Sequence, residues 1–288
     1  MMAALVTAAA TVIGILGGCT SVSTAGQPSR EISADTLSDD VDLATGREGG
    51  ATPEAAVAEP IEQDENSPFE SDDEFSWLRT SPASIRMVWR DEQGAAYGQL
   101  ERGRRALNQL GHDVVAIASG GIYAPGLRPL GLYVENGVEM TPLNLAEGSG
   151  NFFLQPNGVF SIVGGVAAID RTAQFSEWHS NNSNQDQIDW ALQSGPMLVI
   201  DGEANPLFTH SSESTHIRNA IAVDTEGNVV LIRSKGLVTM RQLADRCLEL
   251  GATDALYLDG TIARLDWVRT GLAVPINIPV ATMIAVVE

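Results

Sequence analysis

Short apolar runs alternate with Gly, Pro, Asn and Asp from residue 80 to the end of the chain. Runs of this length between turn residues are typical of β-strands. Tight turns are expected at residues 135–137, 156–158 and 225–228, and strands joined by such turns pair antiparallel. The strands predicted by this pattern are residues 84–89, 114–118, 131–134, 138–141, 151–154, 159–163, 197–200, 220–223, 229–233, 255–258 and 280–287.

Two longer segments carry apolar residues at helical spacing. Residues 97–110 and 240–250 each place one apolar stripe on a helix face. Thr239 with Gln242 three positions later predicts a capping box at the start of the second helix. Cys247 lies on its apolar face, so we expect a buried thiol that packs as a small hydrophobic group. The predicted fold is a single α+β domain with a mixed, largely antiparallel sheet and two main helices.

The chain begins with an apolar run of small residues that ends at Cys19. The run is too short to span a membrane and is typical of a signal peptide over residues 1–18. The ending, residues 16–19, resembles the lipobox of bacterial lipoproteins, in which the cysteine carries acyl chains after cleavage. An ordinary signal peptide with a chance cysteine is the alternative, since no basic residue precedes the run. We expect export and lipidation at Cys19, with the protein anchored in the cell envelope. In a Gram-negative cell, Thr20 after the cysteine favours the outer membrane, facing the periplasm.

The net charge of −20 is concentrated in one part of the chain. Residues 20–79 hold 15 acidic residues against 3 arginines, which contributes −12 and leaves −8 for residues 80–288. This acidity excludes general binding to nucleic acid, because phosphate backbones require a basic surface. Few large apolar residues occur before Phe69, so residues 19–79 are predicted to be a disordered, extended spacer behind the lipidated cysteine. Residues 74–78 are the expected first ordered edge of the domain.

Two short motifs follow predicted strands. Asp259-Gly260 ends one strand, where loops build active sites, and the alternative is an aspartate that caps its own turn. Ser119-Gly120-Gly121 ends another strand. Glycines there let backbone amides approach an anion or a sugar, and the alternative is a simple turn.

Two further motifs precede predicted strands. The segment 193–196, Gln-Ser-Gly-Pro, fixes a bend from which Gln193 and Ser194 can face a cleft. Arg218-Asn219 places a guanidinium beside strand ends, where it suits bidentate binding of phosphate, and the alternative is a surface ion pair. The four histidines lie far apart, and no metal-ligand spacing, P-loop or nucleophile elbow occurs. We therefore expect no metal and no cofactor.

In their order along the chain, these motifs resemble the phosphodiester glycosidase family, in its bacterial branch. That family includes a lysosomal enzyme that removes N-acetylglucosamine from a phosphodiester on mannose. The resemblance covers roughly residues 84–287 and implies a phosphodiester glycosidase-like domain with an active cleft at strand ends. The matching stretches are residues 119–123, 129–137, 142–144, 150–154, 156–160, 193–199, 218–220 and 258–260.

The resemblance also implies roles for individual residues. Asp259 would be the principal catalytic carboxylate, and Arg218 would hold the phosphate. The substrate would be a sugar phosphodiester or another envelope glycan, with an N-acetylglucosamine-phosphate linkage as the expected type. The residues that would shape the pocket or contact substrate are Ser119, Gly120, Gly121, Gln193, Ser194, Gly195, Asn219, Gly260, Thr261 and Arg264.

Two departures from the family pattern touch this site. Ser119 stands where the family usually has Asn, and Thr261-Ile262-Ala263 replaces a serine-bearing run. Two alternatives therefore stay open: an envelope lipoprotein that binds glycans or phosphorylated polymers without cleaving them, and a different hydrolase on the same fold. Asp259 can act as nucleophile, base or stabiliser of an oxocarbenium-like centre. Asp224 and Asp201 are positional candidates for a second carboxylate.

Overall fold

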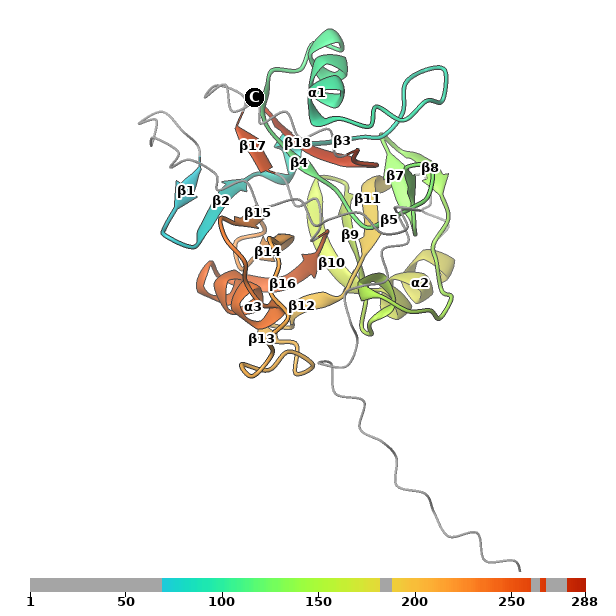
Figure 1. The fold of residues 1–288 in the computed structure, drawn as a ribbon. Coiled ribbons are helices and arrows are strands. Elements are labelled where there is room, and N and C mark those ends of the chain that lie inside the picture. Colours follow the sequence, from blue (N-terminus) through green and yellow to red (C-terminus); the bar gives the residue numbers. More distant parts are fainter. Residues whose placement is uncertain (1–68, 182–187, 260–264, 268–278) are drawn as a thin grey trace, which may run out of the picture. The chain divides into compact units, whose positions relative to one another are not determined.

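Three antiparallel sheets, whose strands are labelled in Figure 1, supply the residues of the main hydrophobic core. The computed structural model describes residues 69–181, 188–259, 265–267 and 279–288, which all belong to one compact unit. The largest sheet has seven strands. Their order across the sheet is β1 (Glu70–Ser71), β2 (Phe75–Thr80), β15 (Val229–Ser234), β14 (Asn219–Asp224), β16 (Ala252–Tyr257), β12 (Met197–Ile200) and β13 (Glu203–Ala204).

The other sheets are smaller. The five-stranded sheet has the order β10 (Val166–Arg171), β9 (Gly158–Val163), β11 (Ile188–Ser194), β7 (Tyr133–Glu135) and β8 (Val138–Thr141). The four-stranded sheet has the order β17 (Leu265–Trp267), β4 (Val114–Ser119), β18 (Met283–Val287) and β3 (Ile85–Val88). Strands β5 (Tyr123–Ala124) and β6 (Arg128–Pro129) form a small ribbon. Every strand pair within the described ranges is antiparallel, so the predicted α+β class is confirmed.

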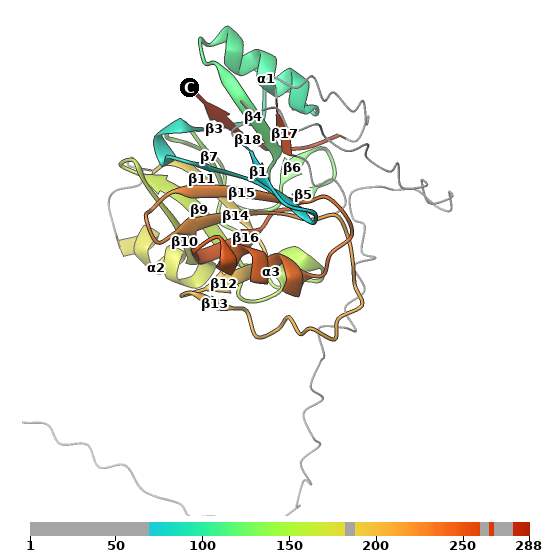
Figure 2. The ribbon, with the colours of Figure 1, turned by 90° about the vertical axis from the view of Figure 1, so that its left-hand side faces the viewer.

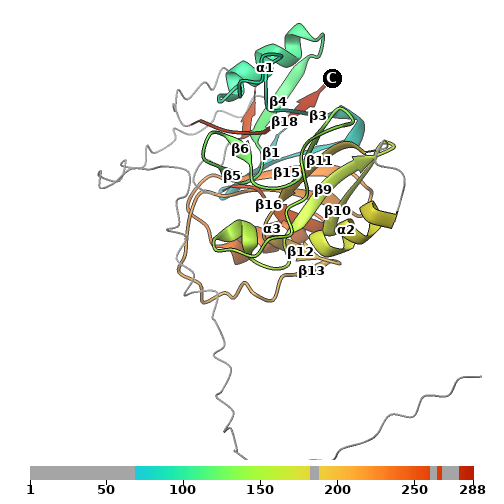
Figure 3. The same cartoon turned by 90° about the vertical axis from the view of Figure 1, so that its right-hand side faces the viewer.

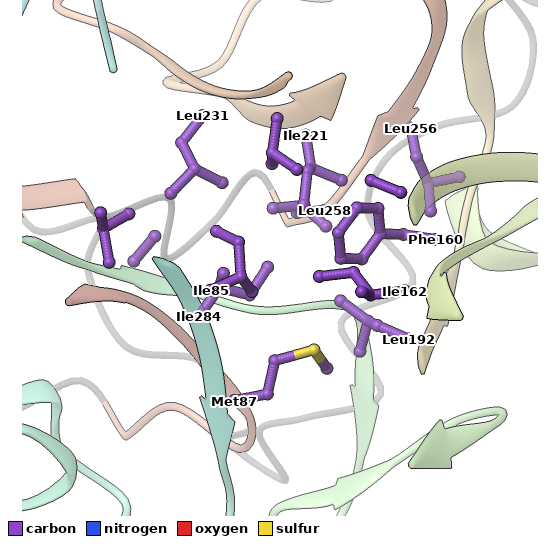
Figure 4. Packing of buried hydrophobic residues seen from close by; sticks show 14 of the residues in the cluster. Ile85, Met87, Phe160, Ile162, Leu192, Ile221, Leu231, Leu256, Leu258 and Ile284 are labelled. Carbon is purple, nitrogen blue, oxygen red and sulfur yellow. The ribbon is translucent and has the colours of Figure 1, made fainter. Parts of the chain in front are cut away.

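The main core lies where the three large sheets face one another (Figure 4). Side chains alternate between the two faces of a strand, so each sheet sends every second residue inward. Met87 comes from the four-stranded sheet, Phe160 from the five-stranded sheet, and Ile221 with Leu256 from the seven-stranded sheet. Burial of this apolar surface is the main term that holds the sheets together.

Each outer face of a sheet is covered by a helix. Helix α1 (Leu100–Gln109) packs Leu107 on the four-stranded sheet, and α3 (Met240–Glu249) packs Leu243 on the seven-stranded sheet (Figure 2). Helix α2 (Thr172–Asn181) packs Phe175 on the five-stranded sheet (Figure 3). Two short 3₁₀ helices, η2 (Pro82–Ser84) and η3 (Asn151–Phe153), complete the described elements. None of the described helices is both long and apolar enough to cross a lipid bilayer.

Local signals in the sequence are confirmed where they are strong. Asn136 and Gly137 have positive φ angles of 49° and 80° in the turn between β7 and β8, as a tight hairpin requires. The capping box of α3 is present: Thr239 Oγ1 accepts from the Gln242 amide at 3.1 Å. The Thr239 amide donates to Gln242 Oε1 at 2.9 Å. The turn at 225–228 joins β14 to β15 as predicted.

Other predictions were wrong. Residues 151–154 include the 3₁₀ helix η3 and no strand. Asn157 does not lie at a hairpin tip, because it is buried and its Nδ2 donates to Phe152 O at 3.0 Å. Strands β10 and β11 and the third helix α2 were not predicted. Strand β2 belongs to the large sheet through its pairing with β15, so the folded part begins before residue 80. The leader, Cys19 and the spacer up to residue 68 lie outside the described residues.

Cys247 lies on the buried face of α3, as predicted. Burial raises the pKa of its thiol to about 12, so almost no thiolate exists near neutral pH. In a Cys19→Ala chain, in which Cys247 is the remaining cysteine, we expect a thiol reagent such as iodoacetamide to label it far more slowly in buffer than in denaturant. Mass spectrometry of the labelled chain measures this directly. Equal labelling in both conditions would contradict the buried position.

Candidate active site

The end of β16 brings together segments that are far apart in the sequence. Strands β14 and β16 pair with Ala220 opposite Tyr257. Continuing that register by two residues places Arg218 opposite Asp259. Hydrogen bonds support the extension: the Leu258 amide donates to Asn219 O at 3.2 Å, and the Asp259 amide donates to Asn219 Oδ1 at 2.9 Å. The segments that carry the predicted arginine and carboxylate therefore lie side by side at the ends of β14 and β16.

Asn219 and two serines join the three sheets at this edge. Asn219 Nδ2 donates to Ser119 Oγ at 3.0 Å and to Ser119 O at 3.2 Å, across 100 residues of sequence. Ser194 Oγ donates to Leu258 O at 3.1 Å. Ser119 and Ser194 are buried, whereas Asp259 is half-buried at the rim. We call Ser119, Ser194, Arg218, Asn219 and Asp259 the strand-end cluster.

Arg218 lies inside the protein, with 1% of its surface exposed. Its Nε donates to Val238 O at 2.9 Å, and its Nη2 donates to Ser214 O at 3.2 Å. Its Nη1 lies 3.3 Å from the Tyr257 hydroxyl, and Nη2 lies 3.3 Å from His216 Nδ1. The alternative of a surface ion pair is therefore wrong. Arg218 ties two loops to the end of the sheet. Each of its three guanidinium nitrogens has a partner inside the protein, so its charge acts on the site without the predicted bidentate contact to phosphate.

The glycines of the predicted site sit where chain segments approach closely. The Gly120 amide donates to Thr282 O at 2.8 Å, and a Cβ on Gly120 would collide with the Thr282 side chain. A Cβ on Gly121 would lie 3.2 Å from Gln193 O. A Cβ on Gly195 would lie 2.6 Å from the Cβ of Asn157. These glycines permit close packing around the cluster, and the Gly120 amide has an internal acceptor.

Gln193 points away from the cluster into a buried network, with 1% of its surface exposed. Its Oε1 accepts from the amides of Leu132 at 3.0 Å and Asn144 at 2.9 Å. Its Nε2 donates to Asn144 O at 2.8 Å and to Thr172 Oγ1 at 3.3 Å. A contact between Gln193 and substrate was predicted, but its carboxamide forms an internal clamp instead. The role of Asn144 in that clamp was missed, because a single Asn in a loop gives no distinctive signal.

The positional candidates for a second carboxylate lie at the wrong end of the sheet. Asp224 pairs with Ala252, the first residue of β16, and the Asp201 amide donates to Asp254 Oδ1 at 3.1 Å. Both are thus separated from Asp259 by the length of β16, roughly 15–20 Å for a strand of this size. At this distance neither carboxylate can act together with Asp259. The side chain of Asp224 instead caps the turn after β14.

A group of carboxylates occupies that opposite end. Burial raises the pKa of Asp170 and of Asp254, and the charges of Asp201 and Asp170 add to the effect on Asp254. Asp201 itself pairs with Arg171 at 2.6 Å. In the described ranges, no three His, Cys, Asp or Glu side chains are placed to hold a metal ion. Gly260, Thr261 and Arg264, which the sequence analysis also assigned to the site, lie outside the described residues.

Comparisons with known proteins give a consistent result. The model of the phosphodiester glycosidase family matches residues 112–287. The uncharacterized protein YigE of Escherichia coli strain K12 is 36% identical over 203 residues, which cover 70% of this chain and 76% of that protein.

The fold is shared with a solved enzyme structure. The catalytic domain of zebrafish N-acetylglucosamine-1-phosphodiester alpha-N-acetylglucosaminidase, auto-inhibited by its pro-peptide, matches with a TM-score of 0.54 and 15% identity. The match covers 78% of this chain and 85% of that domain. A hypothetical protein from Synechocystis matches with a TM-score of 0.47 and 14% identity, over 76% of this chain and 61% of that one.

Proposed function

Because the chain belongs to the phosphodiester glycosidase family, we propose that it hydrolyses the bond between the anomeric carbon of a sugar and the phosphate of a sugar phosphodiester. The observations that carry the proposal are the pairing of Ala220 with Tyr257 and the bond from the Asp259 amide to Asn219 Oδ1 at 2.9 Å, which bring the segments of Arg218 and Asp259 together beyond the end of β16. The fold shared with the zebrafish enzyme, whose name describes an N-acetylglucosamine-1-phosphodiester as its substrate, supports an N-acetylglucosamine-phosphate linkage.

The reaction adds one water molecule and breaks one carbon–oxygen bond. The anomeric carbon gains the hydroxyl group of the water, the phosphate monoester leaves with the electron pair of the broken bond, and the remaining proton of the water is released to solvent. Such a leaving group is already a stable anion, so it needs less protonation than the alcohol released from an ordinary glycoside. The fixed charge of Arg218 stabilises the negative charge that develops on the phosphate. Asp259, in its ionised form, stabilises the positive charge that develops at the sugar ring, whether or not it also forms a bond to carbon.

Hydrolysis in ¹⁸O-labelled water tests this proposal. The full chain is incubated with the α-1-(methyl phosphate) diester of N-acetylglucosamine, and the products are analysed by mass spectrometry. Cleavage at carbon leaves the methyl phosphate unlabelled, which is the expected result. Label in the methyl phosphate would show phosphorus–oxygen cleavage by a different hydrolase. Saturable binding of sugar phosphodiesters without release of sugar would favour the binding lipoprotein instead.

The second part of the proposal concerns where the protein lies in the cell, and it is supported by the sequence of residues 1–79. We propose that the protein is exported and anchored in the cell envelope by acyl chains on Cys19. The apolar run before Cys19 and the acidic spacer after it, at residues 20–79, support this arrangement. Each buried methylene adds about 0.8 kcal/mol to membrane binding, so two or more acyl chains give a firm anchor.

Replacing Cys19 with Ala is expected to move the protein from the membrane fraction to the soluble fraction. Cell fractionation followed by immunoblotting measures the distribution. Cys247→Ala is the matched control, because it removes the buried cysteine, which the proposal gives no role in anchoring. An unchanged membrane fraction for Cys19→Ala would contradict lipidation.

A further inference from the structure

An open hollow lies beside the strand-end cluster, and no function has yet been assigned to it. It has a volume of about 560 Å³ and is lined by residues 128–131 and 141–146. Ligand sites of small molecules and sugars have volumes in this range. The hollow is thus large enough for one or two sugar units.

The walls of the hollow are tied together by side-chain hydrogen bonds. Asn144 Nδ2 donates to Leu130 O at 2.8 Å, and Thr141 Oγ1 donates to Gly131 O at 2.6 Å. The buried carboxamide of Gln193 joins the two walls. Its Oε1 accepts from the amide of Asn144, in one wall, and from the amide of Leu132, which follows the other wall in sequence. A Cβ on Gly131 would collide with this carboxamide. The hollow is therefore a preformed feature of the fold.

A short chain of contacts connects the hollow to the strand-end cluster. The amide of Leu130, in the wall of the hollow, donates to Ile122 O at 3.2 Å. The Ile122 amide lies 3.5 Å from Ser194 Oγ, which in turn donates to Leu258 O beside Asp259. One residue thus separates the wall of the hollow from the cluster. A substrate with more than one unit bound at Asp259 can extend toward the hollow.

The residues that line the hollow suit a ligand with an anionic group and apolar surface. Arg128 is exposed at the hollow, and within the part of the chain that the structure describes its guanidinium has no ion-pair or hydrogen-bond partner. Pro129, Pro142 and Leu143 supply apolar surface around it. A guanidinium that has no carboxylate partner suits a phosphate or carboxylate of the ligand.

We propose that this hollow is a subsite for the leaving-group side of the substrate, in which Arg128 binds the next phosphate along a phosphate-linked glycan. The inference rests on the proposed function and extends it from a single linkage to a polymer. The domain is acidic, with −8 over residues 80–288, so a ligand with two successive phosphates needs local positive charge, which Arg218 and Arg128 would supply. The charge of the buried Arg218 acts on the phosphate that leaves from behind the strand ends, and the exposed Arg128 contacts the one that follows.

Two probes separate this subsite from the catalytic cluster. The short probe is the α-1-(methyl phosphate) diester of N-acetylglucosamine. The long probe joins the same sugar, through its phosphate, to a hexose that carries a second phosphate. For Arg128→Gln, we expect KM for the long probe to rise about tenfold, as loss of one charge-assisted contact gives, with kcat unchanged and the short probe unaffected. Arg105→Gln, which removes the same charge from exposed helix α1, is the matched control and should change neither probe.

The outcomes distinguish this inference from the proposed function. Equal KM values of wild type and Arg128→Gln for the long probe would overturn the subsite, and so would an equal loss for both probes. If neither probe is cleaved, the glycosidase proposal fails, and calorimetric titration of the long probe still tests the subsite. Binding about tenfold weaker in Arg128→Gln supports it; equal binding, or no binding to wild type, overturns it.

Discussion

Replacing Asp259 with Asn is expected to lower kcat/KM for a sugar 1-phosphodiester by about 10³-fold, the range that catalytic side chains of this kind contribute. The substitution keeps the size of the side chain and removes its negative charge. The backbone amide of residue 259 can still donate to Asn219 Oδ1, so the strand register is retained. We therefore expect the melting temperature to change by only about 2 °C, as for substitutions outside the packed core.

Asp201→Asn is the matched control for this experiment. It makes the same carboxylate-to-amide change at the opposite end of the large sheet, where Asp201 is exposed and pairs with Arg171. Wild-type turnover is expected for this variant. If Asp259→Asn retained turnover comparable to that of Asp201→Asn, Asp259 would not be the catalytic carboxylate, whatever the substrate.

Short-range features of this fold could be predicted, because a few adjacent residues determine each of them. The capping box at Thr239, the hairpin at Asn136-Gly137 and the burial of Cys247 are all of this kind. Helix α2 was missed because its buried side chains are only Thr172 and Phe175, too few for an apolar stripe. Strand β11 was missed in part because it ends in Gln193 and Ser194, which are polar and yet buried.

The members of the site were found at strand ends, but their convergence was not visible in the sequence. Asn219 joins Ser119, 100 residues earlier, to Asp259, 40 residues later. Only the register of β14 against β16 brings these positions together, and register depends on long-range packing. The same reason explains why Asp224 and Asp201 are not partners of Asp259. Both follow predicted strands, but the direction of those strands places them at the opposite end of the sheet.

The burial of Arg218 was equally hidden, because its acceptors are backbone carbonyls that any residue can supply. Val238 O and Ser214 O lie in two separate loops, and neither residue type indicates an arginine partner. Burying a guanidinium requires that its donors be satisfied, since an unpaired polar group inside a protein is costly. Arg218 therefore serves the fold and the chemistry together: the contacts that bury it also hold its charge at the strand ends.

Removal of this guanidinium is expected to have the largest effect on stability of any single change at the site. Arg218→Met keeps apolar bulk but removes the guanidinium from Val238 O, which retains the His216 amide at 3.1 Å, and from Ser214 O and the Tyr257 hydroxyl, at a cost of about 3 kcal/mol. For a domain of this size that lowers the melting temperature by roughly 6–12 °C. Arg218→Lys keeps the charge, but a single ammonium cannot reproduce the planar guanidinium contacts, so we expect an intermediate loss.

Thermal unfolding followed by circular dichroism measures the loss in each variant, and turnover is measured well below the lowered melting temperature. Arg86→Gln is the matched control, because Arg86 also donates to two backbone carbonyls, Ala83 O and Ile85 O, but from a less buried position. It should cost less than about 1 kcal/mol. Arg218→Lys, with its charge retained, should keep more turnover than Arg218→Met. Equal turnover in the two variants would show that the charge of Arg218 does not assist the departing phosphate and that the residue acts on the fold alone.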